Sequence, residues 1–136
     1  MTTDERMQSL FRRESRSFLQ YVREASPWAS EDDRAMRDDV IAMADDELAG
    51  VGELAAFLQS RHIAVPHLGA FPIGFTSFNF VTIRSLVRPL LNDLRDGIAR
   101  LTADADALGA DERIALTPMI ERKQKHLRVL EGLPCR

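Results

Sequence analysis

Two glutamates fall on apolar helix faces, where a carboxylate needs a partner. At about 100° per residue, Glu14 lies near the centre of the stripe between Phe11 and Phe18. By the same count, Glu47 lies inside the apolar stripe of the next helical pattern. Burying an unpaired carboxylate is costly, so both positions predict either a cation or a hydrogen-bonding network in the interior.

The last helical pattern offers partners for these carboxylates. Lys123 falls at the centre of its inner face, and His126 falls near the edge of that face. One interpretation is a buried network in which the two glutamates meet Lys123, His126 or the Tyr21 hydroxyl. Such a network can specify how the helices are aligned along the bundle.

A metal site is the alternative interpretation of the same side chains. Carboxylates and imidazole are ligands of iron and manganese, and several of them must converge on one point to bind the ion. The candidate ligands are Glu14, Glu47 and His126, with Asp93 on the flank of the preceding helix. The distance between the two glutamate carboxyl groups discriminates between a shared ion and separate partners.

Four amphipathic segments must position these residues. Apolar residues at three- and four-residue steps predict helices over about 4–25, 31–61, 77–108 and 111–132. The long segment at 62–76 contains too many Pro and Gly residues to be helical. It is long enough to run the length of a bundle, so we expect two antiparallel helical hairpins joined by a long crossover.

The predicted crossover is unusually rich in phenylalanine for a connecting segment. Phe71, Phe75 and Phe78 predict that it packs on the bundle. The alternative is a small-ligand pocket, or a surface through which the protein forms a homodimer. His62 and His67 lie in or beside the same segment, but two histidines without a nearby carboxylate or cysteine are a weak metal signal.

The composition favours one all-helical domain spanning residues 1–136. The chain is 45% hydrophobic and 29% charged, which is sufficient for a single core. Its net charge of -3, with acidic and basic residues mixed, gives no electrostatic footprint for a nucleic acid. The single cysteine, Cys135, excludes a disulfide framework. Without a signal-peptide core or a long apolar run, we expect a cytoplasmic protein that binds no membrane.

Four helices in two hairpins, an apolar crossover and inward glutamates on the first two helices resemble the ferritin-like four-helix-bundle superfamily. In its metal-binding members, two helices each supply a Glu and two supply Glu-x-x-His to a di-iron or di-manganese centre. The resemblance implies that Glu14 is the lone Glu of the first helix and Glu47 the Glu of the second helix's motif. The motif is degenerate, because Gly50 stands where its His belongs and Glu121 is followed by Gln124.

We therefore expect a ferritin-like bundle that has no di-iron centre and no other cofactor. It acts as a structural or interaction protein rather than as an enzyme. The alternative is a degenerate metal-binding protein or oxidoreductase that holds iron or manganese at Glu14, Glu47 and His126.

Overall fold

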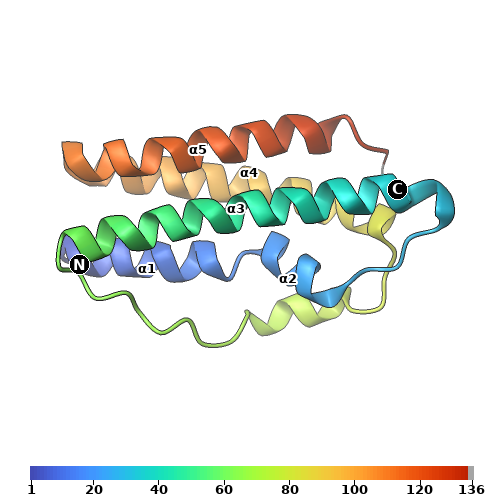
Figure 1. The fold of residues 1–136 in the computed structure, drawn as a ribbon, viewed down its shortest axis with the longest axis horizontal. Helices are drawn as coiled ribbons and strands as arrows, with labels where there is room; N and C mark the ends of the chain where they lie inside the picture. Colours follow the sequence, from blue (N-terminus) through green and yellow to red (C-terminus); the bar gives the residue numbers. More distant parts are fainter. Residues whose placement is uncertain (135–136) are drawn as a thin grey trace.

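A computed structural model describes residues 1–134 as a bundle of long helices (Figure 1). Cys135 lies outside the described residues. The prediction of an all-helical bundle is confirmed. The α-helices are α1 (Thr3–Ser15), α2 (Phe18–Ala25), α3 (Arg34–Ser60), α4 (Ile83–Ala107) and α5 (Ala110–Glu131), with short 3₁₀ turns η1 (Glu31–Asp33) and η2 (Ile73–Phe78).

The first predicted helix, over 4–25, is broken in two. It ends at Ser15 and resumes at Phe18, with Ser17 as the N-cap of α2. The Ser17 hydroxyl accepts a hydrogen bond from the Gln20 backbone N–H, as a capping serine does. The helical periodicity continues across the break, which is why the sequence pattern predicts one helix.

The predicted start of the third helix, at 77, is too early by between one and two helical turns. Helix α4 begins at Ile83, where the Thr82 side chain accepts from the Ser85 N–H. Thr76 instead donates its hydroxyl to the Ile73 carbonyl within η2. Between the two elements Phe80 has a φ of 61° and a fully exposed side chain, so it does not belong to the buried stripe of α4.

The crossover (residues 61–82) runs along the bundle from the end of α3 to the start of α4 (Figure 1). As a result α3 and α4 begin at the same end, where the Arg84 guanidinium lies 2.5 Å from the Asp33 carboxylate. The Ile83 N–H also donates to the Trp28 carbonyl there, at 2.8 Å. The non-helical segment is longer than the predicted 62–76.

Two side chains of α1 and that of its C-cap residue Arg16, spaced one helical turn apart, bind the crossover. Gln8 donates to the Ala64 carbonyl, Arg12 Nε to the His67 carbonyl and Arg16 Nε to the Gly69 carbonyl. Gly69 has a φ of 71°, a conformation that glycine adopts without steric cost. The path of the crossover is therefore set by these side chains.

A polar layer (Glu14, Glu47, Lys123 and His126) divides the buried interior into two apolar halves. One half is built around Phe18, Val40, Ile83, Leu86, Val87 and Leu90, and the other around Met7, Leu10, Leu54, Leu58, Leu101 and Leu116. In α1, α3 and α5, the residues of the polar layer interrupt the apolar stripe at the boundary between the two halves. In α4 that position is taken by Gly97, between Leu94 and Leu101.

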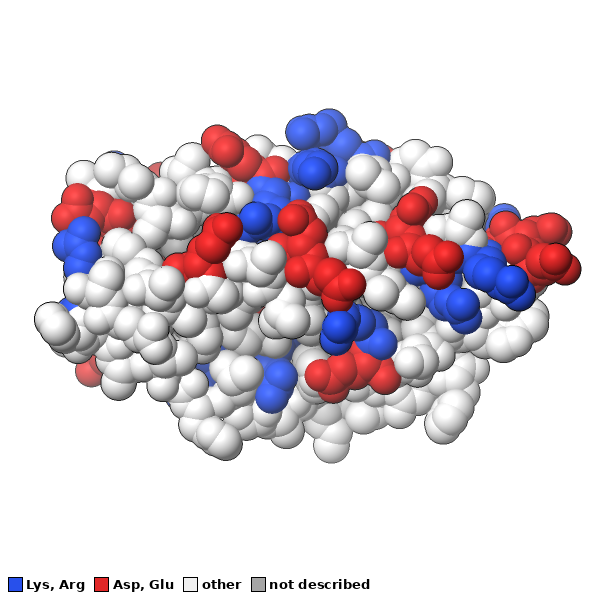
Figure 2. Space-filling model, viewed as in Figure 1, with Lys and Arg blue, Asp and Glu red and all other residues white. Residues whose placement is uncertain are grey.

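Acidic and basic side chains are interspersed on the face drawn in Figure 2. This mixture agrees with the charge pattern of the sequence. Within residues 1–134, no helix has both the length and the apolar composition required to cross a membrane.

Candidate functional site

Lys123 lies between the two buried glutamates. Its Nζ is 2.7 Å from Glu14 Oε1 and 3.2 Å from Glu47 Oε2, which joins α5 to both α1 and α3. All three residues are buried: Glu14 exposes 3% of its surface, and Glu47 and Lys123 each expose 5%. Lys123 is one of the three partners that the sequence predicts for the glutamates.

The electrostatics favour a charged lysine at this position. Burial lowers the pKa of Lys123, but the charges of Glu14 and Glu47 and their hydrogen bonds outweigh it, so the pKa is raised above its ordinary value. An ammonium group therefore occupies the point on which two carboxylates from different helices converge. This cation offsets the cost of burying them.

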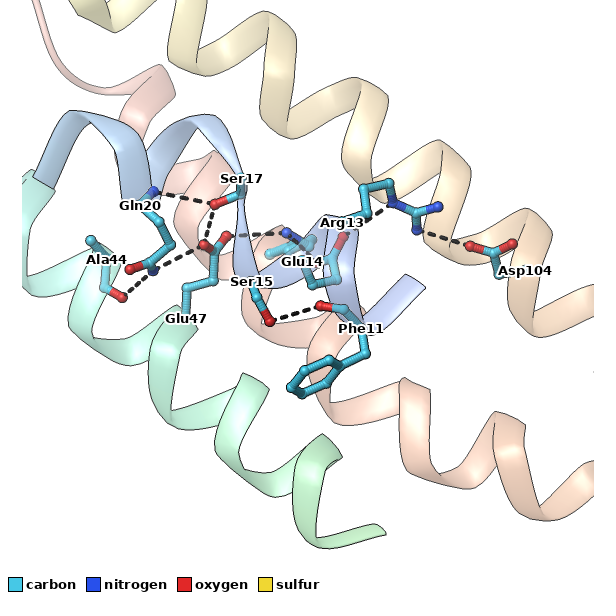
Figure 3. A network of polar contacts seen from close by, with 10 residues as sticks. Phe11, Arg13, Glu14, Ser15, Ser17, Gln20, Ala44, Glu47 and Asp104 are labelled. Atoms are coloured by element: carbon cyan, nitrogen blue, oxygen red, sulfur yellow. Dashed lines mark hydrogen bonds and ion pairs between the residues drawn. The ribbon is translucent and has the colours of Figure 1, made fainter. Parts of the chain in front are cut away.

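Glu47 also receives two neutral donors from the start of α2 (Figure 3). The Ser17 hydroxyl donates to Glu47 Oε1 at 2.5 Å, and Gln20 Nε2 donates to the same oxygen at 3.1 Å. Gln20 Nε2 also donates to the Ala44 carbonyl at 2.7 Å. The break between α1 and α2 thus places two polar side chains against a carboxylate of α3.

Arg13 extends the network from Glu14 to α4. Its Nε lies 3.5 Å from Glu14 Oε2, and its Nη2 lies 2.8 Å from Asp104 Oδ2 (Figure 3). Arg6, two turns earlier in α1, lies 3.4 Å from the other oxygen of Asp104. The polar layer is therefore connected by ion pairs to all four arms of the bundle.

His126 is buried, but it interacts with Asp46 rather than with Glu14 or Glu47. Its Nε2 lies 2.8 Å from Asp46 Oδ2. Burial lowers the pKa of His126, and the hydrogen bond and charge of Asp46 oppose this effect only in part. Burial raises the pKa of Asp46, but His126 and Arg122 outweigh it, so the pKa of that carboxyl is lowered.

The three predicted metal ligands are therefore only partly brought together. Glu14 and Glu47 converge on one point, and His126 is directed to a different carboxylate. Within residues 1–134, no three His, Cys, Asp or Glu side chains are grouped so as to hold a metal ion. The Tyr21 hydroxyl, the third predicted partner, hydrogen-bonds Asn79 of the crossover instead. A metal role for Glu14, Glu47 and His126 stays a prediction.

A cavity of about 380 Å³ opens beside the polar layer, between α1, α4 and the crossover. Glu14, Lys123 and Gly97 lie at its inner side, and Asp93 of α4 lies on its wall. A Cβ at Gly97 would meet only Lys123 Nζ, at 3.9 Å, so the absence of a side chain leaves this space open. Burial raises the pKa of Asp93, although Lys123 opposes the shift.

The crossover phenylalanines pack on α2. The Phe18 ring lies 5.1 Å from that of Phe75 and 5.0 Å from that of Phe78, and the Tyr21 ring lies 5.4 Å from that of Phe71. These aromatic pairs fix η2 against the bundle. The role of Phe71, Phe75 and Phe78 in a dimer interface stays a prediction.

The sequence patterns do not predict the network residues Arg13, Ser17, Gln20, Asp46 and Asp104. Ser17 and Gln20 are polar residues three and six positions after Glu14, near the inner face of the first predicted helix. Asp46 directly precedes Glu47, and helical phase alone places it toward the side of α3. Arg13, Ser17, Gln20 and Asp46 lie within six residues of an inward carboxylate, and this proximity is a sequence signal for them, whereas Asp104 has none.

Comparison of the chain with protein-family models, with curated protein sequences and with solved structures found no match.

Proposed function

We propose that the protein is a metal-free helical bundle of ferritin-like arrangement, with a structural or interaction role. The observation that carries this proposal is the position of Lys123 Nζ, 2.7 Å from Glu14 and 3.2 Å from Glu47. A built-in ammonium group takes the place that a metal ion has between the carboxylates of a ferritin-like centre. A metal ion could bind both glutamates only by displacing it.

The path of the chain supports the ferritin-like arrangement. In an up-and-down bundle each helix starts where the previous one ends, whereas one long crossover makes two consecutive helices start at the same end. Here α3 and α4 start at the same end, joined there by Arg84 and Asp33. The crossover covers the side of the bundle formed by α1 and α2.

The positions that would complete a di-metal centre also support a metal-free role. At Gly50, where the motif requires His, the Arg122 guanidinium fills the space, and a Cβ there would clash with Arg122 Nη1. In α4 the position level with the polar layer is Gly97, which has no side chain to act as a ligand.

One observation favours the second candidate, a metal-binding protein or oxidoreductase using iron or manganese. Glu14 and Glu47 lie close enough to share one cation, and the Nδ1 of His126 is buried without a hydrogen-bond partner. In that role His126 would turn from Asp46 toward the glutamates after Lys123 had left. Both rearrangements cost free energy, so this candidate ranks second.

Elemental analysis of protein purified without chelator tests the choice, followed by titration with Fe(II) and Mn(II). We expect no stoichiometric metal in the wild-type protein. Tight binding of one or two ions per chain, lost in Glu14→Ala and in Glu47→Ala, would overturn the proposal. The matched control is Glu121→Ala, which removes an exposed carboxylate from α5.

The interaction partner we propose is a second copy of the chain, bound through the crossover. Ile73, between Phe71 and Phe75, and Phe80, after Phe78, are 86% and 105% exposed, which is unusual for large apolar side chains close together in sequence. Sedimentation equilibrium should show a dimer that Phe80→Ser converts to monomer. A monomer at high wild-type concentration contradicts this part of the proposal.

A further inference from the structure

We infer that the cavity between α1, α4 and the crossover is a binding site for a small monocarboxylate with an apolar body. This inference goes beyond the structural role proposed above. The cavity, at about 380 Å³, falls in the usual range of small-molecule sites, about 300–1,000 Å³. Its walls differ in chemistry, and this difference defines the ligand.

The cavity carries positive charge on three arginines, of which Arg100 alone interacts electrostatically with a carboxylate of the lining, that of Asp93. Arg12, Arg16 and Arg100 line the cavity, and none of them forms an ion pair within residues 1–134. Arg13, in contrast, also lines the cavity but is paired with Asp104. Three arginines without an ion pair therefore line one cavity, although the whole chain has a net charge of -3.

The crossover holds two of these arginines in place. Arg12 and Arg16 each use Nε to bind a crossover carbonyl, at 3.2 and 2.9 Å. The Arg16 guanidinium also lies over the Phe71 ring, 4.8 Å from its centroid. The terminal nitrogens of both groups remain available, and a guanidinium fork matches the two oxygens of a carboxylate.

The acidic residues of the cavity limit the ligand to a single negative charge. Glu14 lies at the inner side and Asp93 on the α4 wall, so a second anionic group placed deeper in the cavity would meet like charge. A dianion or polyphosphate is therefore disfavoured. The carboxylate belongs beside the arginines and the uncharged body in the rest of the space.

The apolar part of the lining comes from the crossover. Leu68, Ala70, Pro72 and Phe75 line it. A second opening of about 350 Å³ shares Phe75 and Asp93 with the first and adds Phe18 and Phe78, which extends the apolar surface. An aromatic ring or a short alkyl chain can bury its surface there, and Gly97 leaves the room for it.

Isothermal titration calorimetry with 2-naphthoate and decanoate tests the inference. We expect at least one of these acids to bind with one-to-one stoichiometry. Each acid has a neutral and a dianionic control. For 2-naphthoate these are 2-naphthalenemethanol and 2,6-naphthalenedicarboxylate, and for decanoate they are 1-decanol and decanedioate. Both controls should bind at least about tenfold more weakly than the acid that binds. Binding of neither acid, or equal binding of acid and alcohol, overturns the inference.

Two variants locate the site without altering the polar layer. Arg100→Gln should weaken acid binding at least about tenfold, whereas Arg88→Gln, an exposed arginine of the same helix away from the cavity, should not. Gly97→Leu should fill the cavity and abolish binding, whereas Gly52→Leu, in open space on α3, should not. Circular dichroism checks that each variant is folded.

If both Arg100→Gln and Gly97→Leu bind the acid as the wild type does, the ligand lies elsewhere and the inference is wrong. The calorimetry uses metal-free protein and needs no dimer. Its outcome is therefore independent of the metal analysis that tests the proposed function.

Discussion

The Ser17 hydroxyl performs two tasks, because it caps α2 and donates a 2.5 Å hydrogen bond to Glu47 of α3. The break in the first helical arm is thereby linked to the buried carboxylate. In an unbroken helix the Gln20 N–H would donate to the Arg16 carbonyl, whereas at the break the Ser17 hydroxyl satisfies it. The break and the polar layer stabilise each other.

Ser17→Ala should lower the free energy of unfolding by about 1–2 kcal/mol, because it removes a helix cap and one donor to Glu47. Urea denaturation followed by circular dichroism measures the change. Ser30→Ala is the matched control, since Ser30 occupies the N-cap of η1 without a side-chain capping bond. Equal losses in the two variants would contradict the double task of Ser17.

Lys123→Met should be among the most destabilising single substitutions in the protein. It leaves two buried carboxylates without their cation, and removing one partner of a buried ion pair costs about 3–5 kcal/mol. Adding Glu14→Gln and Glu47→Gln to Lys123→Met should recover most of this loss, because no buried charge then remains in the triad.

The control for this series is Lys125→Met, which replaces an exposed lysine of the same helix. Its unfolding free energy should stay within about 0.5 kcal/mol of the wild type. A loss for Lys123→Met no larger than that of Lys125→Met would show that the ammonium group does not support the two glutamates.

Two glycines of α3 allow a matched comparison. Gly52→Ala adds a Cβ in open space and should raise the free energy of unfolding by about 0.5–1 kcal/mol through helix propensity. Gly50→Ala should gain less, because its Cβ would displace Arg122 from its contacts with Asp46 and Glu53. Thermal unfolding of both variants measures the difference, and a larger gain at Gly50 would show that Arg122 does not fill this space.

The lowered pKa of His126 makes stability depend on pH. Below the ordinary pKa of 6.5 the unfolded chain takes up a proton at this imidazole more readily than the folded chain does. Stability is therefore fully present above pH 6.5 and falls as the pH decreases through the folded pKa, by at most about 1.4 kcal/mol per pH unit for one proton.

Urea denaturation at several pH values from about 7.5 to about 5, the range in which imidazole titrates, measures this dependence in the wild type and in His126→Gln. The variant should show a shallower loss over the same range. His62→Gln, which changes an exposed histidine, is the control and should retain the wild-type slope. An unchanged slope in His126→Gln would contradict the assignment.

Periodicity predicts the polar layer because the helical phase survives local irregularities. Glu14, Glu47 and Lys123 are spaced so that each falls inside an apolar stripe, and the structure brings their charged groups together. Periodicity cannot reveal the break at Ser17, because the reason for it is a hydrogen bond to a residue thirty positions away.

The start of α4 is missed for a different reason. Thr76 and Thr82 are both residues that cap helices well, and local sequence does not choose between them. The left-handed conformation of Phe80 decides, since it prevents a continuous helix across this position. The cavity is equally invisible in the sequence, because it depends on where the crossover docks and on the absence of a side chain at Gly97.

The way the crossover is fastened has a consequence for amide hydrogen exchange. Carbonyls of Ala64, His67 and Gly69 accept bonds from side chains of α1 and its C-cap residue, while the amides within residues 64–71 of the described chain form no backbone hydrogen bonds. These amides should exchange with deuterium in local openings that leave the helices intact. Residues 64–71 would then lose protection long before α3 and α4, the two helices that the crossover connects.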